Sequence, residues 1–153
     1  MSSNPVNTIE PPQIVTDLKI LRKRSKEWSG TQEELDKLLL DMKMAMIEND
    51  GVGISAIQIG KPYKVFIASN IAFINPRIKS RSPYEKKEWE SCLSCPGAHV
   101  RVKRATQIDV EYTNHLGVKV EATFKDFAAR VIQHEFDHLH GFLIIDKGKV
   151  YQE

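Results

Sequence analysis

The sequence is organised around Gln133-His134-Glu135-Phe136-Asp137-His138, near the end of the chain. Two histidines stand four positions apart, and on an α-helix such positions share one face, so both imidazoles can reach one metal ion. Glu135 is turned about 100° from His134, so it can flank that ion without ligating it. This H-E-x-x-H arrangement is typical of metal-dependent hydrolases.

The composition predicts one ordinary globular domain spanning residues 1–153. The chain has 41% hydrophobic and 27% charged residues and a formal net charge of +2. At this length it can bury roughly 70% of the surface that the unfolded chain exposes. The charge gives no reason to expect a specific nucleic acid or a membrane surface as a partner. Apolar runs fall far short of the roughly 20 residues that span a bilayer.

The N-terminus and the cysteines favour a reducing, cytosol-like compartment. Residues 1–12 are polar, carry three prolines and lack the pattern of a secretory signal, so we expect a flexible arm. The two cysteines, Cys92 and Cys95, are too few for a disulfide framework.

Two long helices are predicted. Thr31 and Glu34 form a capping box, followed by apolar residues at helical spacing as far as Met46. This long N-terminal helix should end near residues 49–51, Asn-Asp-Gly. The metal-bearing helix is expected to begin with Asp126 as its N-cap and to end before Gly141.

The segments between these helices predict strands. Buried strands are expected at residues 65–68 and 73–76, the second ended by a proline. Residues 79–89 are highly charged and predict a loop or a solvated hairpin. Segments 100–104, 108–112 and 119–124 alternate with period two, which favours antiparallel strands. The sequence therefore predicts an α+β fold, with mainly antiparallel sheets packed around a central metal-binding helix and a long N-terminal helix.

Two histidines leave a catalytic metal site incomplete, because such a site usually takes three protein ligands and a water. The third ligand can be Cys92, Cys95, a carboxylate or another histidine. The downstream ligand of zinc endopeptidases is absent, since only 15 residues follow His138. A thiolate is the strongest ligand type left, and Cys92 stands just before the first strand predicted to lie against the helix.

Three stretches together resemble the three motifs of the peptide deformylase family. Residues 51–58 resemble its glycine-rich first motif, residues 90–94 its second and residues 133–139 its third, in the family's order and spacing. The similarity runs from about residue 14 to residue 146. The chain thus resembles a short form of the family that lacks the C-terminal helix of many bacterial members.

The resemblance implies a metal centre and a base. Cys92, His134 and His138 would ligate one divalent ion, with water as the fourth ligand. Glu135 would be the general base that takes a proton from this water. The resemblance implies Fe²⁺ as the native ion, with Zn²⁺, Ni²⁺ or Co²⁺ as alternatives, because one thiolate and two imidazoles do not fix the metal.

The resemblance also implies how the substrate is held. Gln58 and the backbone N–H of Leu93 would bind the oxyanion that forms at the formyl carbon. The residues expected to contact the rest of the substrate are Val52, Gly53, Ser91, Phe127 and Val131. Ser91 replaces the family's usual glycine, which adds strain if its φ is positive and is harmless in the β region. Asp137 is expected to pair with Arg104.

The implied reaction is hydrolysis of N-formyl-methionyl nascent peptides to formate and a free N-terminus. The implied setting is a monomer in the cytoplasm of a bacterial or phage-infected cell, with an organelle as the alternative and the ribosome as a candidate partner. Two other functions stay open. One is a different metal-dependent amidohydrolase or peptidase, and the other is an inactive metal- or peptide-binding module.

Overall fold

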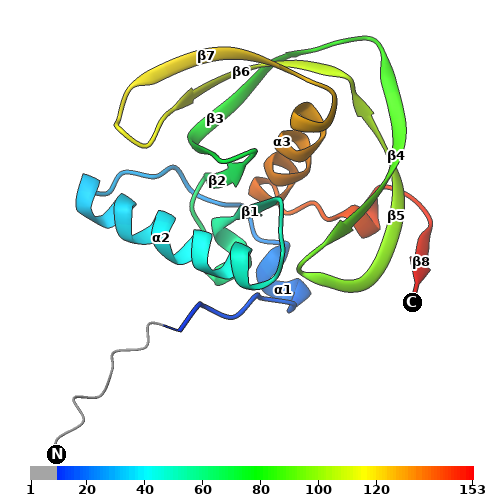
Figure 1. Ribbon diagram of the computed structural model, residues 1–153, viewed down its shortest axis with the longest axis horizontal. Helices are drawn as coiled ribbons and strands as arrows, with labels where there is room; N and C mark the ends of the chain where they lie inside the picture. Colours follow the sequence, from blue (N-terminus) through cyan, green and yellow to red (C-terminus); the bar gives the residue numbers. More distant parts are fainter. Residues whose placement is uncertain (1–9) are drawn as a thin grey trace, which may run out of the picture.

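The computed structural model describes residues 10–153, so most of the expected N-terminal arm lies outside the described residues. Helix α3 (Asp126–Leu139) lies between two antiparallel sheets (Figure 1). One sheet has five strands in the order β1-β2-β3-β6-β7, and the other has three in the order β4-β5-β8. The predicted α+β fold, with antiparallel sheets around a central helix, is confirmed.

The helices are α1 (Leu18–Leu21), α2 (Gln32–Glu48) and α3, with 3-10 turns η1 (Ala56–Ile59) and η2 (Ile144–Asp146). The strands of the larger sheet are β1 (Gly53–Ser55), β2 (Val65–Ala68), β3 (Ile71–Arg81), β6 (Gln107–Thr113) and β7 (Lys119–Lys125). The strands of the smaller sheet are β4 (Glu85–Cys92), β5 (Cys95–Ala105) and β8 (Val150–Gln152). No helix in residues 10–153 is long and apolar enough to cross a bilayer.

Strand β2 is apolar throughout because both of its faces are covered. Side chains of consecutive strand residues point to opposite faces of a sheet. Val65 and Ile67 join the buried cluster beneath α2, whereas Phe66 and Ala68 join the cluster beneath α3. The larger sheet is therefore fixed between two helices, and this positions α3 on one of its faces.

The smaller sheet brings the second motif to the other side of α3. On β4, Glu90 and Cys92 are buried while Trp89 and Ser91 are exposed, as the two-residue period of a strand requires. The inner face of this sheet has its own buried cluster, made by Cys92, Val100, Val102 and Ile144. Residues two apart on one strand thus both face the metal-bearing helix.

The predicted end points of the first long helix are close to the observed ones. Thr31 is the N-cap of α2, and the capping box with Glu34 is present. The helix ends at Glu48, with Asn49 as its C-cap. The short helix α1 precedes it, so the long helix is the second α-helix within residues 10–153.

Three local predictions are wrong. Pro76 does not end β3, because Asn75 takes a positive φ of 50° and the pairing with β6 shifts register there, which accommodates a residue without an N–H. Residues 79–89 lie largely in β3 and β4, whose backbones pair with different strands, β6 and β5. The many charged side chains in residues 79–89 therefore indicate that these strands are exposed to solvent, and they do not exclude backbone pairing.

The third wrong prediction concerns Asp126. It is the first residue of α3 and not its N-cap, which is Lys125. The backbone N–H of Asp126 donates to the carbonyl of Thr106, so this end of the helix is fixed by the preceding sheet. A carboxylate in the first turn still complements the helix dipole.

Candidate active site

Helix α3 and strand β4 together supply a thiol and two imidazoles. The ligand atoms of Cys92, His134 and His138 all lie within 4.8 Å of one another and are shielded from solvent. The Cys92 sulfur is 3.4 Å from Nε2 of His138. The structure thus brings together the two histidines of α3, which stand one helical turn apart, and Cys92 of β4. These are the three ligands that the family resemblance implies.

The chemistry of these donors fits a divalent transition metal. A catalytic metal site usually takes three protein ligands, and sulfur and imidazole nitrogen are ligand types that suit zinc and other transition metals. Burial lowers the pKa of His138 well below its ordinary value, which leaves the ring neutral and able to ligate. The Nδ1 atom of His134 lies 2.9 Å from the Glu90 carboxylate, so its Nε2 is left free to face the ion.

Glu135 lies close to the ligand His134, and Ser55 and Gly53 adjoin its carboxylate. Its Oε2 atom is 4.0 Å from Nε2 of His134. The hydroxyl of Ser55 lies 3.1 Å from Oε1 of Glu135 and 2.9 Å from its backbone carbonyl. A Cβ atom on Gly53 would meet Oε2 of Glu135 at 2.7 Å, so only glycine leaves room for this carboxylate. Burial raises the pKa of Glu135 to about 7.

Gln58 is held so that its amide nitrogen faces the sulfur of Cys92 and the hydroxyl of Ser94. Its Oε1 accepts from the backbone N–H of Ser55 at 2.9 Å, which fixes the orientation of the amide. Its Nε2 lies 3.1 Å from the hydroxyl of Ser94 and 3.6 Å from the sulfur of Cys92. Turn η1 carries Gln58 and follows β1 directly, so the first motif reaches the second across the cavity.

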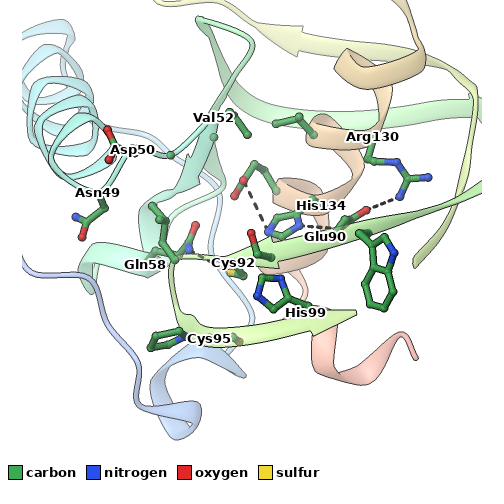
Figure 2. Close-up of a pocket in the computed structure, with 18 of the residues that line it drawn as sticks. Asn49, Asp50, Val52, Gln58, Glu90, Cys92, Cys95, His99, Arg130 and His134 are labelled. Carbon is green, nitrogen blue, oxygen red and sulfur yellow. Dashed lines mark hydrogen bonds and ion pairs between the residues drawn. The ribbon is translucent and has the colours of Figure 1, made fainter. Parts of the chain in front are cut away.

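These side chains line one cavity of about 600 Å³ (Figure 2). Its lining includes most of the residues that the sequence singled out: Val52, Gly53, Gln58, Ser91, Cys92, Leu93, Phe127, Val131, His134 and Glu135. His138 is not part of the lining and lies buried behind it. Ser91 is absent from the described residues with positive φ, so serine at this position carries no such strain.

The Glu90 carboxylate receives hydrogen bonds from three side chains. Arg104 donates through Nε at 2.8 Å and Nη2 at 2.9 Å, and Arg130 donates through Nη1 at 2.6 Å. His134 is the third partner. Although burial alone would raise its pKa, the hydrogen bonds from Arg104 and His134 hold the pKa of Glu90 well below its ordinary value. Glu90 is therefore a fixed anion that orients His134.

The predicted pair between Arg104 and Asp137 is present at 2.6 Å. The sequence did not identify Arg130, because an arginine on a helix is usually solvated. Its only signal is its place four residues before His134. Cys95, one of the candidates that the sequence left open for the third ligand, also lines the cavity. A hydrogen bond with Cys92 lowers the pKa of Cys95 to about 7.

Known proteins are similar to this chain in both sequence and fold. The profile of the polypeptide deformylase family matches residues 12–152. The peptide deformylase of Pseudothermotoga lettingae is 39% identical over 130 residues, covering 83% of this chain and 76% of that protein. The crystal structure of the Thermotoga maritima peptide deformylase superposes with a TM-score of 0.87 at 39% identity, covering 91% of this chain and 98% of that one.

A second similar structure holds a peptide. The Met-Ala-Ser-bound crystal structure of a class I type b peptide deformylase from Acinetobacter baumannii superposes with a TM-score of 0.85 at 29% identity. It covers 90% of this chain and 98% of that one.

Proposed function

The chain belongs to the peptide deformylase family, and we propose that it removes the formyl group of nascent polypeptides at the cavity between β4 and α3. It is a metal-dependent hydrolase of that family. The substrate is the N-terminal formyl-methionine, and the products are formate and a free amino group. The observation that carries the proposal is the meeting of Cys92, His134 and His138 beside Glu135 in one cavity.

The residues around the ligands have distinct roles in this reaction. Cys92, His134 and His138 would hold a divalent ion, and this ion would supply a Lewis acid for the formyl carbonyl and lower the pKa of a nearby water. Glu135 accepts a proton from this water as the water oxygen bonds to the formyl carbon, and it returns the proton to the amine nitrogen as the carbon–nitrogen bond breaks. The Gln58 amide and the Leu93 backbone N–H donate to the oxygen that becomes negative, which is typically worth ~2.7–4 kcal/mol per donor.

The rest of the cavity binds the peptide. Strand β1 and the exposed residues Val52 and Ser91 offer backbone groups to an extended chain, in the way that a strand is added to a sheet edge. Phe127 and Val131 supply apolar walls for the methionine side chain. The Met-Ala-Ser peptide bound to the Acinetobacter baumannii relative supports a peptide as the occupant.

The native ion is proposed to be Fe²⁺, with Zn²⁺, Ni²⁺ or Co²⁺ as substitutes, because a mixed thiolate and imidazole site accepts all of them. We further propose that the protein acts as a monomer in the cytoplasm, or in an organelle, on chains that leave the ribosome. Metal analysis of protein purified without oxygen identifies the ion.

Release of formate from formyl-Met-Ala tests the function. We expect turnover of this substrate and none of acetyl-Met-Ala or of an internal peptide bond. Activity on the last two alone would assign the chain to another class of amide hydrolase.

The variant Glu135→Gln tests the base. It should lower turnover by about 10²–10⁴-fold, the usual contribution of general base catalysis, while the bound metal stays stoichiometric. An inactive binding module predicts metal without formate release in both proteins.

A further inference from the structure

Ser55 contacts two of the groups to which the reaction is assigned. It is the last residue of β1, it stands directly before turn η1, and it is fully buried. Its backbone N–H donates to Oε1 of Gln58 at 2.9 Å. Its hydroxyl lies 3.1 Å from Oε1 of Glu135. One residue therefore links the side chain proposed to bind the oxyanion to the side chain proposed as the base.

The Ser55 hydroxyl lies between two oxygen atoms of the same residue. Besides the Glu135 carboxylate, it is 2.9 Å from the backbone carbonyl of Glu135. A serine hydroxyl has a single proton to donate, and both of these oxygens accept as long as the carboxyl is ionised. The two contacts hold Oε1 close to the backbone of its own helix, so one oxygen of the carboxylate has a fixed place.

The other oxygen of Glu135 lies beside the metal ligands. Its Oε2 is 4.0 Å from Nε2 of His134, the atom that is left free to ligate an ion. A Cβ atom on Gly53 would meet this same oxygen at 2.7 Å, so the space that Oε2 occupies depends on a glycine. The two carboxylate oxygens therefore have different surroundings, because a hydroxyl binds Oε1 while Oε2 adjoins a ligand atom.

We propose that Ser55 is a positioning residue for the reaction. Its hydroxyl holds Oε1 of Glu135, so that Oε2 is the oxygen that takes the proton from water and returns it to the amine nitrogen. This inference rests on the proposed function, since it concerns the base of that reaction. A general base acts only within hydrogen-bond reach of the proton it takes, and a small displacement from that position lowers the rate.

The variant Ser55→Ala removes the hydroxyl and keeps the backbone N–H that holds Gln58. We expect kcat for formyl-Met-Ala to fall about tenfold, which is the scale of one hydrogen bond to a charged group. The KM and the amount of metal bound per chain should stay as in the unaltered protein, because the substrate and the ligands do not contact this hydroxyl in the proposed site. An unchanged kcat would overturn the proposal.

The same substitution in Glu135→Gln separates positioning from a merely structural role. If the hydroxyl acts through the carboxylate, Ser55→Ala should lower the residual turnover of Glu135→Gln no further, because the group that it orients is already lost. This residual turnover is measured at high enzyme concentration. An equal tenfold fall in both backgrounds would refute the positioning role, because the hydroxyl would then act independently of the base.

Ser25→Ala is the matched control. Ser25 is 7% exposed, and its hydroxyl has no hydrogen-bond partner within residues 10–153. Its loss should leave kcat and KM unchanged, and an equal tenfold fall in this variant would overturn the proposal, because loss of any buried hydroxyl would then have the same effect. Absence of formyl-Met-Ala turnover in the unaltered protein would instead overturn the proposed function itself.

Discussion

At the scale of single residues, the cavity depends on one buried anion, Glu90, that holds a metal ligand in place. Glu90 is 9% exposed. Its carboxylate links β4 to Arg104 on β5 and to Arg130 and His134 on α3. Two buried cations and a metal ligand therefore rely on one side chain. A partner that orients a ligating histidine typically accounts for 10- to 100-fold in metal affinity.

Glu90→Gln tests this dependence. The substitution leaves Arg104 and Arg130 partly uncompensated, and breaking a buried ion pair costs about 3–5 kcal/mol. We expect a large loss of unfolding free energy in urea and about 10- to 100-fold weaker metal binding, measured by competition with a chromogenic chelator. The control is Glu88→Gln on the same strand, whose carboxylate is 48% exposed, and it should change neither quantity. Equal effects at both positions would exclude a special role for Glu90.

Gly53 is required by the close approach of three groups. A Cβ atom there would lie 2.7 Å from Oε2 of Glu135, 2.9 Å from Val131 and 3.0 Å from the carbonyl of Ile67. Forcing a methyl group into such a site costs about 1–3 kcal/mol and displaces the flexible neighbour, the glutamate. Gly53→Ala should therefore lower kcat more than tenfold and reduce Tm. Full activity with a normal Tm would show that the surroundings adapt without cost.

At the scale of elements, helix α2 illustrates what sequence patterns predict well. Its N-cap, its capping box and its last turn depend on residues close in sequence, so local chemistry was sufficient. Thr31→Ala should cost about 1 kcal/mol and lower Tm by roughly 2–4 °C. Thr31→Ser keeps the hydroxyl and should restore most of the loss, while kcat stays constant in both variants. If Thr31→Ala has the same Tm as the unaltered protein, the cap does not stabilise the fold.

Strands β3 and β4 illustrate where local patterns fail. Residues 79–89 are strand because backbone ladders form there: residues 80–81 pair with residues 108–109 of β6, and residues 85–89 pair with residues 101–105 of β5. These partners lie outside the short window in which a charge pattern is read. The same limit applies to the site. The spacing of His134 and His138 predicts a shared ligand face, whereas Arg130 enters the site only because β4 and β5 fold over α3. The family resemblance implied which residues ligate the metal, whereas only the structure shows which residues hold those ligands in place.

At the scale of the whole molecule, an ion pair joins the beginning of the described chain to its end. Arg22, the C-cap of α1, donates two hydrogen bonds to Asp146, which is 124 residues away, at 2.9 and 3.0 Å. The hydrogen bond from Arg22 lowers the pKa of Asp146 below its ordinary value of 3.8. A carboxyl with a lowered pKa in the folded state stabilises the fold above its unfolded pKa and loses this effect as the pH falls through the folded pKa.

The variant Asp146→Asn tests this pH-dependent stabilisation. The unaltered protein should have the higher urea midpoint at pH 7, and the difference between the two proteins should shrink as the pH falls below about 4 and vanish once the carboxyl is protonated. Added salt should also reduce the difference, because the pair is exposed to solvent. A difference that stays constant from pH 7 to pH 3 would mean that shape, and not charge, stabilises this contact.

The three ligands lie on two elements, β4 and α3, and this determines when the metal can bind during folding. Cys92 and His138 are 46 residues apart, so an unfolded chain would have to close a long loop to bring them together. Strong uptake of the ion therefore has to wait until β4 has docked on α3, which makes metal capture one of the last events in the maturation of each new molecule. When refolding is started in the presence of Co²⁺, the thiolate-to-cobalt absorption should appear together with the native tryptophan fluorescence. Absorption that precedes it would mean that the ion guides folding instead of following it.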